Sequence, residues 1–541
     1  MTVLESTLPT LISPHNRALP LLTLTDLRIL ETQAAAALPQ HTLMSRAGKA
    51  AASYLQEQIT RDTAIEKSKH KVWVVAGPGN NGGDALIVAA ELHRAGFAVD
   101  LCMPLEVKPD DARWALDTAR AAGVAITSTP PASLESYTWL VDGMFGIGLT
   151  RPLEGVFATI ARQLSQRTKA KSRRGGVLAL DTPSGLDSDT GTVVGEKPDQ
   201  GGARSENQND GAAVHATHTI TFIGAKPGLF TAQGRDLAGT VTVAPIGIDS
   251  TTRTAVQLNA PALFADFLPP RDFATNKGTF GSLAVVGGDT GMCGAPILAS
   301  RAALYTGAGK VHVALLGDGA PPYDPPHPEL MLHAIDDLPL DKMDALAVGC
   351  GMGLRDIATR VMHDVLPLDV PKLFDADALN LISTDPSLAA QVTARGVQGD
   401  PCVLTPHPLE AARLLGTDAP GVQRNRLAAA RALAARFAAV VVLKGTGTVI
   451  AAPDGRVAIN PTGNAALATG GTGDVLGGII GALLAQHLPR YEAALAGVYL
   501  HGLAADTLSA QGHGPAGLTA GELAPMVRTL LNRMFYPATG G

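Results

Sequence analysis

Two glycine-rich turns that each end in an acid lie in opposite halves of this chain. The first is residues 77–84, Gly-Pro-Gly-Asn-Asn-Gly-Gly-Asp, directly after the apolar run 71–76. The second is residues 470–474, Gly-Gly-Thr-Gly-Asp, directly before the apolar run 475–480. Such turns can place unpaired N–H groups and one carboxylate at the start of a helix, which suits phosphate. The sequence therefore indicates two active sites that handle phosphorylated ligands.

The first turn has alternatives. It lacks the Lys-Ser/Thr of a P-loop and the spacing of a dinucleotide fingerprint, and a plain helix start explains it as well. Two further segments follow apolar runs: residues 141–152, with Asp142, a glycine loop and Arg151, and residues 181–187, which begin with Asp181. Arg151 could hold a phosphate or be a solvated loop charge, and the turn at 181–187 could be simple turn chemistry.

The second turn is typical of a ribokinase-like phosphoryl-transfer site. Its backbone amides would stabilise the transferring phosphoryl group, and Asp474 would deprotonate the accepting hydroxyl. A glycine-rich helix N-cap is the alternative. Three other segments follow predicted strands: 375–380 with two acids, 405–410 with His407 and Glu410, and 444–448, which begins with Lys444. Each of these side chains also has an explanation that involves no ligand: the acids of 375–380 can be turn residues, His407 a structural histidine, Glu410 a helix-start glutamate and Lys444 a surface lysine.

The elements that must position these residues alternate between strand and helix. In the first half we expect a helix from Thr23, capped by Thr25 or Asp26, and a helix over 85–95 after the strand 72–76. This alternation predicts two doubly wound α/β domains, 1–250 and 251–541, with the boundary where the pattern lapses. In such sheets ligands bind at the carboxyl ends of the strands, where Asp84, Asp142 and Asp181 fall. The polar stretch 196–211 is predicted to be a flexible surface insertion.

Composition excludes several classes of function. The 541 residues are 46% apolar and only 4% aromatic, with a net charge of −6, so a nucleic-acid partner is not expected. The four cysteines, Cys102, Cys293, Cys350 and Cys402, form no CxxC, which indicates neither a zinc site nor a disulfide framework. We see no signal peptide, and the apolar run 475–484 is too short to span a membrane. We therefore expect a cytoplasmic protein.

Five segments of the first half, in order, resemble the NAD(P)HX epimerase family, the N-terminal YjeF-type domain: 42–48, 77–84, 141–152, 181–187 and 223–228. The resemblance covers about residues 20–250 and implies a Rossmann-like fold. It implies that Asp181 lies against the hydrated nicotinamide and shuttles a proton, and that Asn81, Asp142 and Ser184 bind K⁺. The residues implied to bind the nucleotide are Asn80, Asn81, Gly82, Gly83, Asp84, Gly146, Ile147, Gly148, Leu149, Thr150, Arg151, Pro152 and Asp181.

Residues 277–525 resemble the ADP/ATP-dependent NAD(P)HX dehydratase family, which has a ribokinase-like fold. The segments that carry this resemblance include 286–288, 294–296, 306–309, 349–353, 375–380, 405–410, 444–448 and 464–474. It implies that Lys444, Gly445, Thr446, Gly447, Thr448 and Gly473 hold the adenine nucleotide. Ala295, Gly353, His407 and Asp474 would line the hydrate site. ADP as phosphoryl donor and Mg²⁺ are implied as well. Asn276 and Leu409 depart from the family pattern, which commonly has His and Gly there.

These resemblances predict a bifunctional nicotinamide-nucleotide repair enzyme. The first half would interconvert the R and S epimers of NADHX and NADPHX. The second would dehydrate the S epimer with ADP, giving AMP and phosphate, because a phosphate ester leaves more easily than hydroxide. One alternative is a ribokinase-type small-molecule kinase with a regulatory nucleotide-binding domain, and another is a binding or scaffold module. We further expect a homo-oligomer, with no membrane or nucleic-acid partner.

Overall fold

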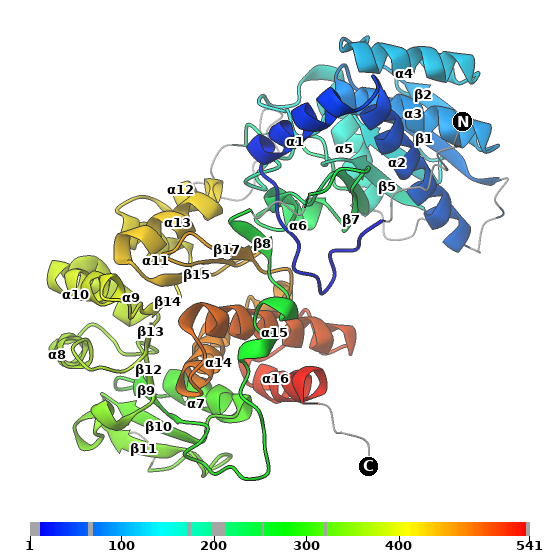
Figure 1. Cartoon of the computed structure of the whole chain (residues 1–541). Coiled ribbons are helices and arrows are strands. Elements are labelled where there is room, and N and C mark those ends of the chain that lie inside the picture. The colour runs from blue at the N-terminus through cyan, green and yellow to red at the C-terminus, as the bar shows by residue number, and fades with distance from the viewer. Residues whose placement is uncertain are drawn as a thin grey trace. The chain divides into compact units, whose positions relative to one another are not determined.

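The computed structural model describes residues 11–62, 66, 69–169, 175–196, 211–250, 254–318 and 322–536. The chain forms two compact units (Figure 1). Unit 1 comprises Met1–His15 and Leu19–Val256, and unit 2 comprises Asn16–Ala18 and Gln257–Gly541. The predicted flexible insertion lies almost wholly outside the described residues, because 197–210 are not described.

Unit 1 is built on a parallel sheet whose strands follow the order β3-β2-β1-β4-β5-β6-β7. The order reverses between β1 and β4, as in doubly wound folds. The predicted parallel α/β architecture is therefore confirmed for this unit. The strands are β1 (Lys71–Ala76), β2 (Ala98–Cys102), β3 (Ala125–Thr127), β4 (Trp139–Gly143), β5 (Gly176–Leu180), β6 (His218–Phe222) and β7 (Thr240–Ala244).

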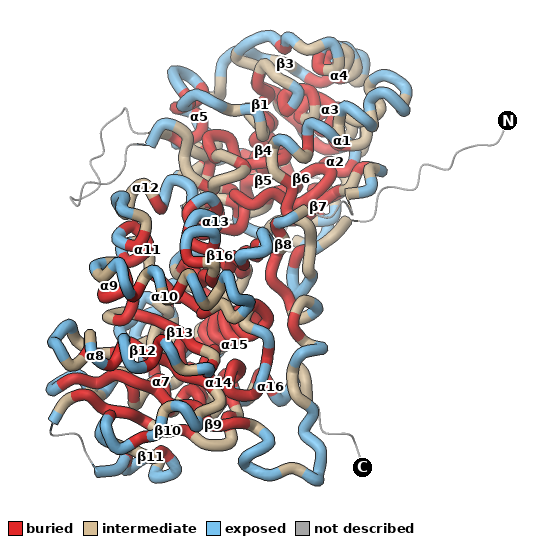
Figure 2. The backbone as a smooth tube through the Cα atoms, turned by 60° about the vertical axis from the view of Figure 1, so that its left-hand side comes forward, coloured by how far each residue is buried: buried red, intermediate tan, exposed pale blue. Residues whose placement is uncertain are grey.

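Helices cover both faces of this sheet because alternate residues of each strand point to opposite sides. In β1, Val72 and Val74 pack into the core that contains α2, α3 and α4, whereas Trp73 and Val75 pack into the core that contains α5. Figure 2 shows the central strands β4 and β5 as buried throughout, whereas the edge strand β3 is exposed or intermediate. The helices are α1 (Leu24–Ala37), α2 (Thr42–Arg61), α3 (Asn80–Arg94), α4 (Asp110–Ala121), α5 (Gly155–Lys169) and α6 (Gly234–Leu237).

Two sequence predictions about helix starts are wrong. The cap of α1 is Thr23, whose side chain and that of Asp26 form a reciprocal capping box, so Asp26 is the third helical residue and not the cap. Helix α3 begins at Asn80 rather than at residue 85. The residues 80–84, expected to be a turn before the helix, therefore form its first turn, because glycines at 82 and 83 do not prevent helix formation when packing favours it.

Unit 2 contains a larger sheet with the order β11-β10-β9-β12-β13-β14-β15-β16-β17-β8 in the described part of the chain. The pairs from β11 to β15 are parallel, and β15, β16 and β17 pair antiparallel. The order reverses between β9 and β12. The strands are β8 (Val256–Leu258), β9 (Ser282–Gly287), β10 (Lys310–Leu315), β11 (Met331–Ala334), β12 (Ala345–Val348), β13 (Lys372–Phe374), β14 (Val403–Leu404), β15 (Val440–Leu443), β16 (Val449–Ala451) and β17 (Val457–Ile459).

The helices of unit 2 also lie on both faces of its sheet. One face packs into a core with α7, α14, α15 and α16, and the yellow helices α8 to α13 lie on the other side in Figure 1. No helix among the described residues is long and apolar enough to cross a membrane. The helices are α7 (Gly294–Thr306), α8 (Asp356–Val365), α9 (Asp377–Thr384), α10 (Pro386–Val397), α11 (Pro408–Leu415), α12 (Ala419–Arg424), α13 (Arg426–Phe437), α14 (Thr472–Ala485), α15 (Arg490–Ala510) and α16 (Ala520–Phe535).

Two candidate active sites

The first candidate site lies where the strand order of the first sheet reverses, between β1 and β4. The segment after β1 leads into α3, whose N-cap, Gly79, makes no side-chain hydrogen bond. N–H groups of the first turn therefore remain available to an anion. A Cβ at Gly82 would lie 1.8 Å from the carbonyl oxygen of Gly77, so a glycine is needed for the helix to start this close to the preceding loop.

Asp142 is a fully buried carboxylate at the end of β4. Its Oδ2 accepts from the N–H of Ser184 at 2.8 Å, and its Oδ1 accepts from the Ser184 hydroxyl at 2.7 Å. The N–H of Met144 donates to Oδ1 at 3.2 Å. Burial raises the pKa of Asp142 to about 6 in spite of these donors. This carboxylate is therefore held rigidly by its neighbours while burial disfavours its charge.

The side chain of Asn81 lies beside the same loop. It is 8% exposed, and its amide oxygen and nitrogen both lack a hydrogen-bond partner among the described residues. A Cβ at Gly146 would lie 3.5 Å from Asn81 Oδ1 and 3.2 Å from Asp181 Oδ2. Buried amide groups are rarely left unpaired, so Asn81 has bonding capacity that a ligand can use.

Asp181 forms an ion pair with a lysine that is almost completely buried. Nζ of Lys226 lies 2.5 Å from Asp181 Oδ1, and it also donates to Thr221 Oγ1 at 2.6 Å and to the carbonyl of Phe222 at 2.8 Å. Asp181 has φ of 64°, a left-handed conformation that costs free energy in a non-glycine residue. The described hydrogen bonds to Asp181 all end on Oδ1. Its Oδ2 therefore points toward Gly146.

Two more carboxyl groups lie within the electrostatic reach of Asp181: Glu31 on α1 and Asp84 on α3. Burial is the main cause that raises the pKa of each, repulsion from Asp181 adds to it, and Lys226 opposes it. For Asp84 the pKa lies well above the ordinary value. The buried ammonium group of Lys226 thus partly offsets the effect of burial on both of these carboxyl groups.

The second candidate site lies at the N-terminus of α14. Gly471 precedes the helix with φ of 89°, and the Thr472 hydroxyl donates to the carbonyls of Leu467 at 2.9 Å and Thr469 at 3.0 Å. Asp474 stands in the first turn. Burial raises the pKa of Asp474 to about 6, with a further contribution from Asp375. Such a carboxyl group is ionised at neutral pH and still basic enough to accept a proton.

Lys444 lies next to that first turn. Its Nζ is 2.6 Å from Asp375 Oδ1 and 4.0 Å from Glu410 Oε2, and a Cβ at Gly473 would lie 3.6 Å from it. Burial lowers the pKa of Lys444, but Asp375 and Glu410 outweigh burial and raise it above the ordinary value. The ammonium group therefore stays charged beside the N-terminus of α14, which no side chain in the described part of the chain caps.

His407 caps a helix in this structure. Its Nδ1 accepts from the N–H groups of Leu409 at 3.1 Å and Glu410 at 3.3 Å, and Nε2 lies 3.2 Å from Glu410 Oε1. Oε2 of Glu410 accepts from the N–H of His407 at 2.8 Å, which completes a capping box. Burial raises the pKa of Glu410 to about 7, although Lys444 opposes this. His407 is predicted to contact the ligand, but both of its ring nitrogens already have partners within the protein.

The loop 349–353 after β12 borders on the same charged groups. A Cβ at Gly351 would lie 3.3 Å from the Cβ of Ala295, and the N–H of Gly353 donates to Asp377 Oδ2 at 2.8 Å. Cys350 is buried, and its pKa is raised well above the ordinary value by burial first and by Asp474 and Asp375 next. The structure therefore brings Ala295, at the start of α7, beside the loop that carries Gly353, and Asp474 acts electrostatically on Cys350 of that loop.

Sequence reasoning gives no role to four charged residues at these sites: Lys226, Asp375, Glu410 and Arg426. Asp375 directly follows β13 and Glu410 is the third residue of a helix that starts with proline, so both positions carry a recognisable signal. Lys226 lies in the segment 223–228 that carries the family resemblance, but neither Lys226 nor Arg426 has a local pattern that predicts its burial, because a charged residue in a sequence is expected at the surface. Both are 1% exposed.

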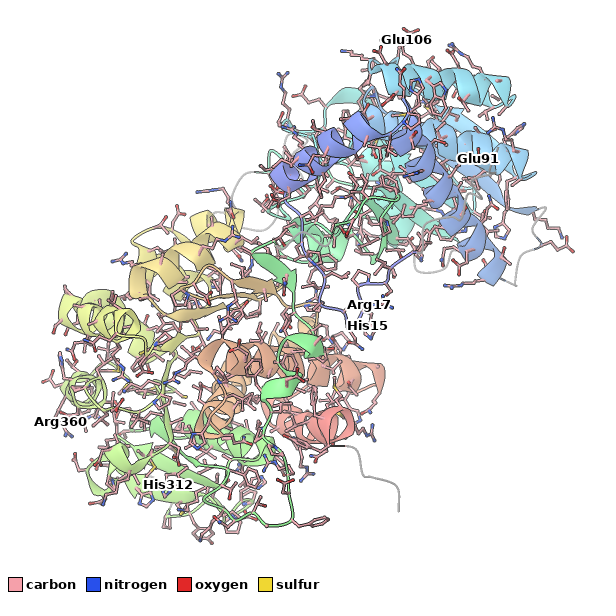
Figure 3. All side chains as sticks on the ribbon, in the orientation of Figure 1. His15, Arg17, Glu91, Glu106, His312 and Arg360 are labelled. Carbon is pink, nitrogen blue, oxygen red and sulfur yellow. The ribbon has the colours of Figure 1, made fainter. Side chains whose placement is uncertain are left out.

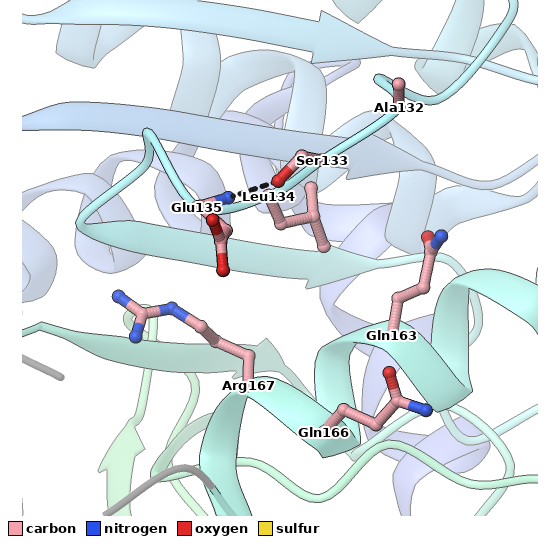
Figure 4. A pocket seen from close by; sticks show the side chains of 7 residues that line it. All are labelled: Ala132, Ser133, Leu134, Glu135, Gln163, Gln166 and Arg167. Atoms are coloured by element: carbon pink, nitrogen blue, oxygen red, sulfur yellow. Dashed lines mark hydrogen bonds between the residues drawn. The ribbon is translucent and has the colours of Figure 1, made fainter. Parts of the chain in front are cut away.

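Other polar groupings lie away from these sites. Figure 4 shows a pocket of about 290 Å³ lined by the loop 132–135 and by Gln163, Gln166 and Arg167 of α5, none of them a predicted site residue. His312 (Figure 3) and His333 lie 3.1 Å apart, from Nδ1 to Nε2, on β10 and β11. Within the described ranges, no group of three or more His, Cys, Asp or Glu residues is placed to hold a metal ion.

Two protein families match this chain. Residues 40–228 match the family described as YjeF-related protein N-terminus, and residues 283–527 match the family described as NAD(P)H-hydrate dehydratase. The two matches fall on unit 1 and unit 2, respectively. Each match includes the acid that the sequence predicts to be catalytic in its half, Asp181 or Asp474.

Individual relatives extend the comparison. The Escherichia coli "Bifunctional NAD(P)H-hydrate repair enzyme Nnr" is 36% identical over 94% of this chain and 93% of its own length. The "ADP-dependent (S)-NAD(P)H-hydrate dehydratase" of Neisseria meningitidis is 50% identical over 48% of this chain and 88% of its own. A crystal structure of the Bacillus subtilis ADP/ATP-dependent NAD(P)H-hydrate dehydratase, co-crystallized with ATP/Mg²⁺, is 33% identical and covers 51% of this chain and 98% of that chain, with a TM-score of 0.46.

Proposed function

Since this chain belongs to the family of bifunctional NAD(P)H-hydrate repair enzymes, we propose that its two candidate sites divide the repair reaction between them. Unit 1 interconverts the R and S epimers of hydrated NADH and NADPH. Unit 2 dehydrates the S epimer with ADP and releases AMP and phosphate. The alternative of a small-molecule kinase gains no support, because relatives that match almost the whole chain are repair enzymes.

The observation that carries the dehydratase assignment is the arrangement of Asp474, Lys444 and Gly473. A carboxyl group with a pKa of about 6, a partly buried ammonium group and helix N–H groups that no described side chain caps converge at the start of α14. We assign Asp474 as the base that takes the proton of the C6 hydroxyl of the hydrate. The hydroxyl oxygen then attacks the terminal phosphorus of ADP, and AMP leaves. Lys444 and the N–H of Gly473 stabilise the charge on the transferring phosphoryl group.

The second step of the dehydration removes the new phosphate ester. The bond between C6 and the ester oxygen breaks, C5 loses a proton, and the C5–C6 double bond of the dihydropyridine re-forms. Esterification makes this step feasible because phosphate is a far better leaving group than hydroxide. Residues 444–448 with Gly473 hold the nucleotide, and Ala295, Gly353 and His407 line the hydrate site in this proposal.

The site suits Mg²⁺ bound mainly through the phosphates of the nucleotide and not by protein ligands alone. Mg²⁺ is commonly bound by one or two carboxylates together with substrate phosphates. Asp375 and Asp474 supply suitable oxygens, whereas no larger acidic cluster is placed to hold an ion among the described residues. We therefore assign Mg²⁺ to the bound nucleotide, where it neutralises phosphate charge.

In unit 1 we assign Asp181 as the group that moves a proton during inversion at the hydroxyl-bearing carbon. Its Oδ2 points toward Gly146 while Lys226 holds Oδ1. The residues 80–84 and 146–152 bind the nucleotide around it. K⁺ fits the oxygens of Asn81, Asp142 and Ser184, because the Asn81 amide is buried without a partner among the described residues and Asp142 is a buried carboxylate. There K⁺ supplies positive charge.

A product analysis tests this function. Purified protein is incubated with NADHX and ADP, and AMP, inorganic phosphate and NADH are quantified. We expect the three products in equal amounts. A phosphorylated hydrate that accumulates without free phosphate would instead identify a kinase. A cytoplasmic location and a homo-oligomeric state stay predictions from the sequence.

A further inference from the structure

Arg426 is a buried arginine that lies directly behind the proposed nucleotide loop, residues 444–448. It is the first residue of α13 and is 1% exposed. Its Nη2 donates to the carbonyls of Leu443 at 3.1 Å and Lys444 at 3.2 Å. Its Nη1 donates to Oε1 of Gln423 at 2.8 Å. This long, charged side chain could extend into water, but it instead donates hydrogen bonds to the backbone that leads into this loop.

The bond to the Lys444 carbonyl has a counterpart on the other side of the same residue. The N–H of Lys444 donates to the carbonyl of Pro406 at 2.9 Å. The backbone of Lys444 is thus held at its N–H by the loop after β14 and at its carbonyl by Arg426. With both groups fixed, the direction in which the Lys444 side chain leaves the backbone is fixed too, and it points toward Asp375 and Gly473.

Gly445 shows how closely the loop packs on the guanidinium group. A Cβ at this position would lie 2.9 Å from Nη1 and 3.0 Å from Nη2 of Arg426, and the residue has φ of 133°, which L side chains rarely adopt. The loop therefore approaches the terminal nitrogens of the guanidinium group through a residue without a side chain. A shorter cation at position 426 would leave a gap under the loop.

We infer that Arg426 is a positioning residue for the nucleoside diphosphate: it fixes the backbone at Lys444 and Gly445 so that the lysine ammonium group and the N–H groups of the loop face the phosphates. This inference rests on the proposed binding of ADP at residues 444–448. The inference goes beyond that proposal because it names a residue, Arg426, that determines the affinity for ADP without touching the nucleotide. Lysine cannot replace arginine here, since one ammonium group cannot reproduce the planar fork of donors.

The test compares Arg426→Lys with wild-type protein and with Arg424→Lys, an exposed arginine two residues away that serves as the matched control. The readouts are the Kd of ADP measured by calorimetry, KM for ADP, KM for (S)-NADHX, kcat and Tm. Losing a hydrogen bond from a charged group commonly costs about tenfold or more in binding. We expect Arg426→Lys to raise both Kd and KM for ADP about tenfold and to leave KM for the hydrate within about twofold, with Arg424→Lys unchanged.

A second variant covers the case in which Arg426→Lys does not fold. Gln423 is exposed, and Gln423→Ala removes the hydrogen bond that Nη1 donates to Oε1 while Arg426 itself stays in place, so we expect a rise of about threefold in KM for ADP with an unchanged Tm. A fall in kcat and Tm of Arg426→Lys with an unchanged Kd for ADP would overturn the inference, as would an unaltered KM for ADP in Gln423→Ala if Arg426→Lys is unfolded. Wild-type protein that neither binds nor consumes ADP would overturn the proposed function itself and this inference with it.

Discussion

Nζ of Lys226 lies 2.5 Å from Oδ1 of Asp181, and the two residues form an ion pair with almost no access to solvent. The lysine also satisfies its remaining protons on Thr221 and Phe222. Breaking a buried ion pair by removing one partner leaves an uncompensated charge, which is costly. The pair therefore fixes both the charge and the orientation of the carboxylate that we assign to epimerisation.

The first prediction concerns this pair. Lys226→Met should lower epimerase activity at least about a hundredfold and destabilise unit 1 by about 3 kcal/mol, because Asp181 loses its counter-charge. Dehydration of pure (S)-NADHX should stay within about twofold, since unit 2 performs it alone. Epimer interconversion is followed by chromatography, and stability by chemical unfolding. Lys49→Met, at an exposed position of α2, is the control.

A double variant separates stability from catalysis at the same pair. Asp181→Asn combined with Lys226→Met removes both charges, so it should recover most of the lost stability and none of the epimerase activity. Epimerase activity that survives in the double variant would contradict the role given to Asp181.

The second prediction concerns the cation proposed for unit 1. Asn81→Leu should reduce epimerase activity in K⁺ buffer about as much as replacement of K⁺ by Li⁺ does in the wild-type protein, because each change removes the same bond. Leucine also removes two buried polar atoms that lack partners among the described residues, so the variant should not be less stable. An epimerase rate that still depends on K⁺ in Asn81→Leu would place the cation elsewhere.

The third prediction is a pH profile. Asp474 must be ionised to accept a proton, and burial together with Asp375 raises its pKa to about 6. The kcat/KM for dehydration of (S)-NADHX should therefore fall as the pH drops below about 6. Asp375→Asn removes a like charge and should move this acid limb to lower pH by roughly one unit. A limb that stays in place or moves to higher pH would show that another group titrates.

The fourth prediction uses two glycines of α14. A Cβ at Gly473 would lie 3.6 Å from Lys444 Nζ and 3.9 Å from Asp375 Oδ2, distances that a folded protein tolerates. Gly473→Ala should therefore fold, yet lower kcat at least about tenfold, because the added methyl group occupies the space where the phosphoryl group must approach. Gly477→Ala, one turn further along, meets only Leu373 at 3.8 Å and should keep its activity. Equal activities in the two variants would argue against phosphoryl transfer at this helix terminus.

Much of the fold follows from local patterns in the sequence. The apolar run before Asp142 predicts a buried strand ending in an acid, and the structure has β4 ending at Gly143 with Asp142 fully buried. The start of α3 is different, because glycines at 82 and 83 indicate a turn, whereas contact with the Gly77 loop favours helix from Asn80. Local propensity is a weak guide where tertiary packing decides.

The charged pairs at the two sites could not be derived from the sequence. Lys226 lies 45 positions after Asp181, and Lys444 lies 69 positions after Asp375. Only the sheet order brings each pair together, and neither lysine has neighbours in the sequence that reveal its burial. His407 shows the opposite case: its position before Pro408 and Glu410 already fits the helix-capping role that it has in the structure.

The most direct test of two cooperating active sites is the recovery of reduced-nicotinamide absorbance from an equal mixture of NADHX epimers with excess ADP. Wild-type protein should restore all of the absorbance. Asp181→Asn should restore the S fraction at the normal rate and the rest only at the spontaneous rate of epimerisation. Asp474→Asn should restore none. Full and equally fast recovery in both variants would contradict the account.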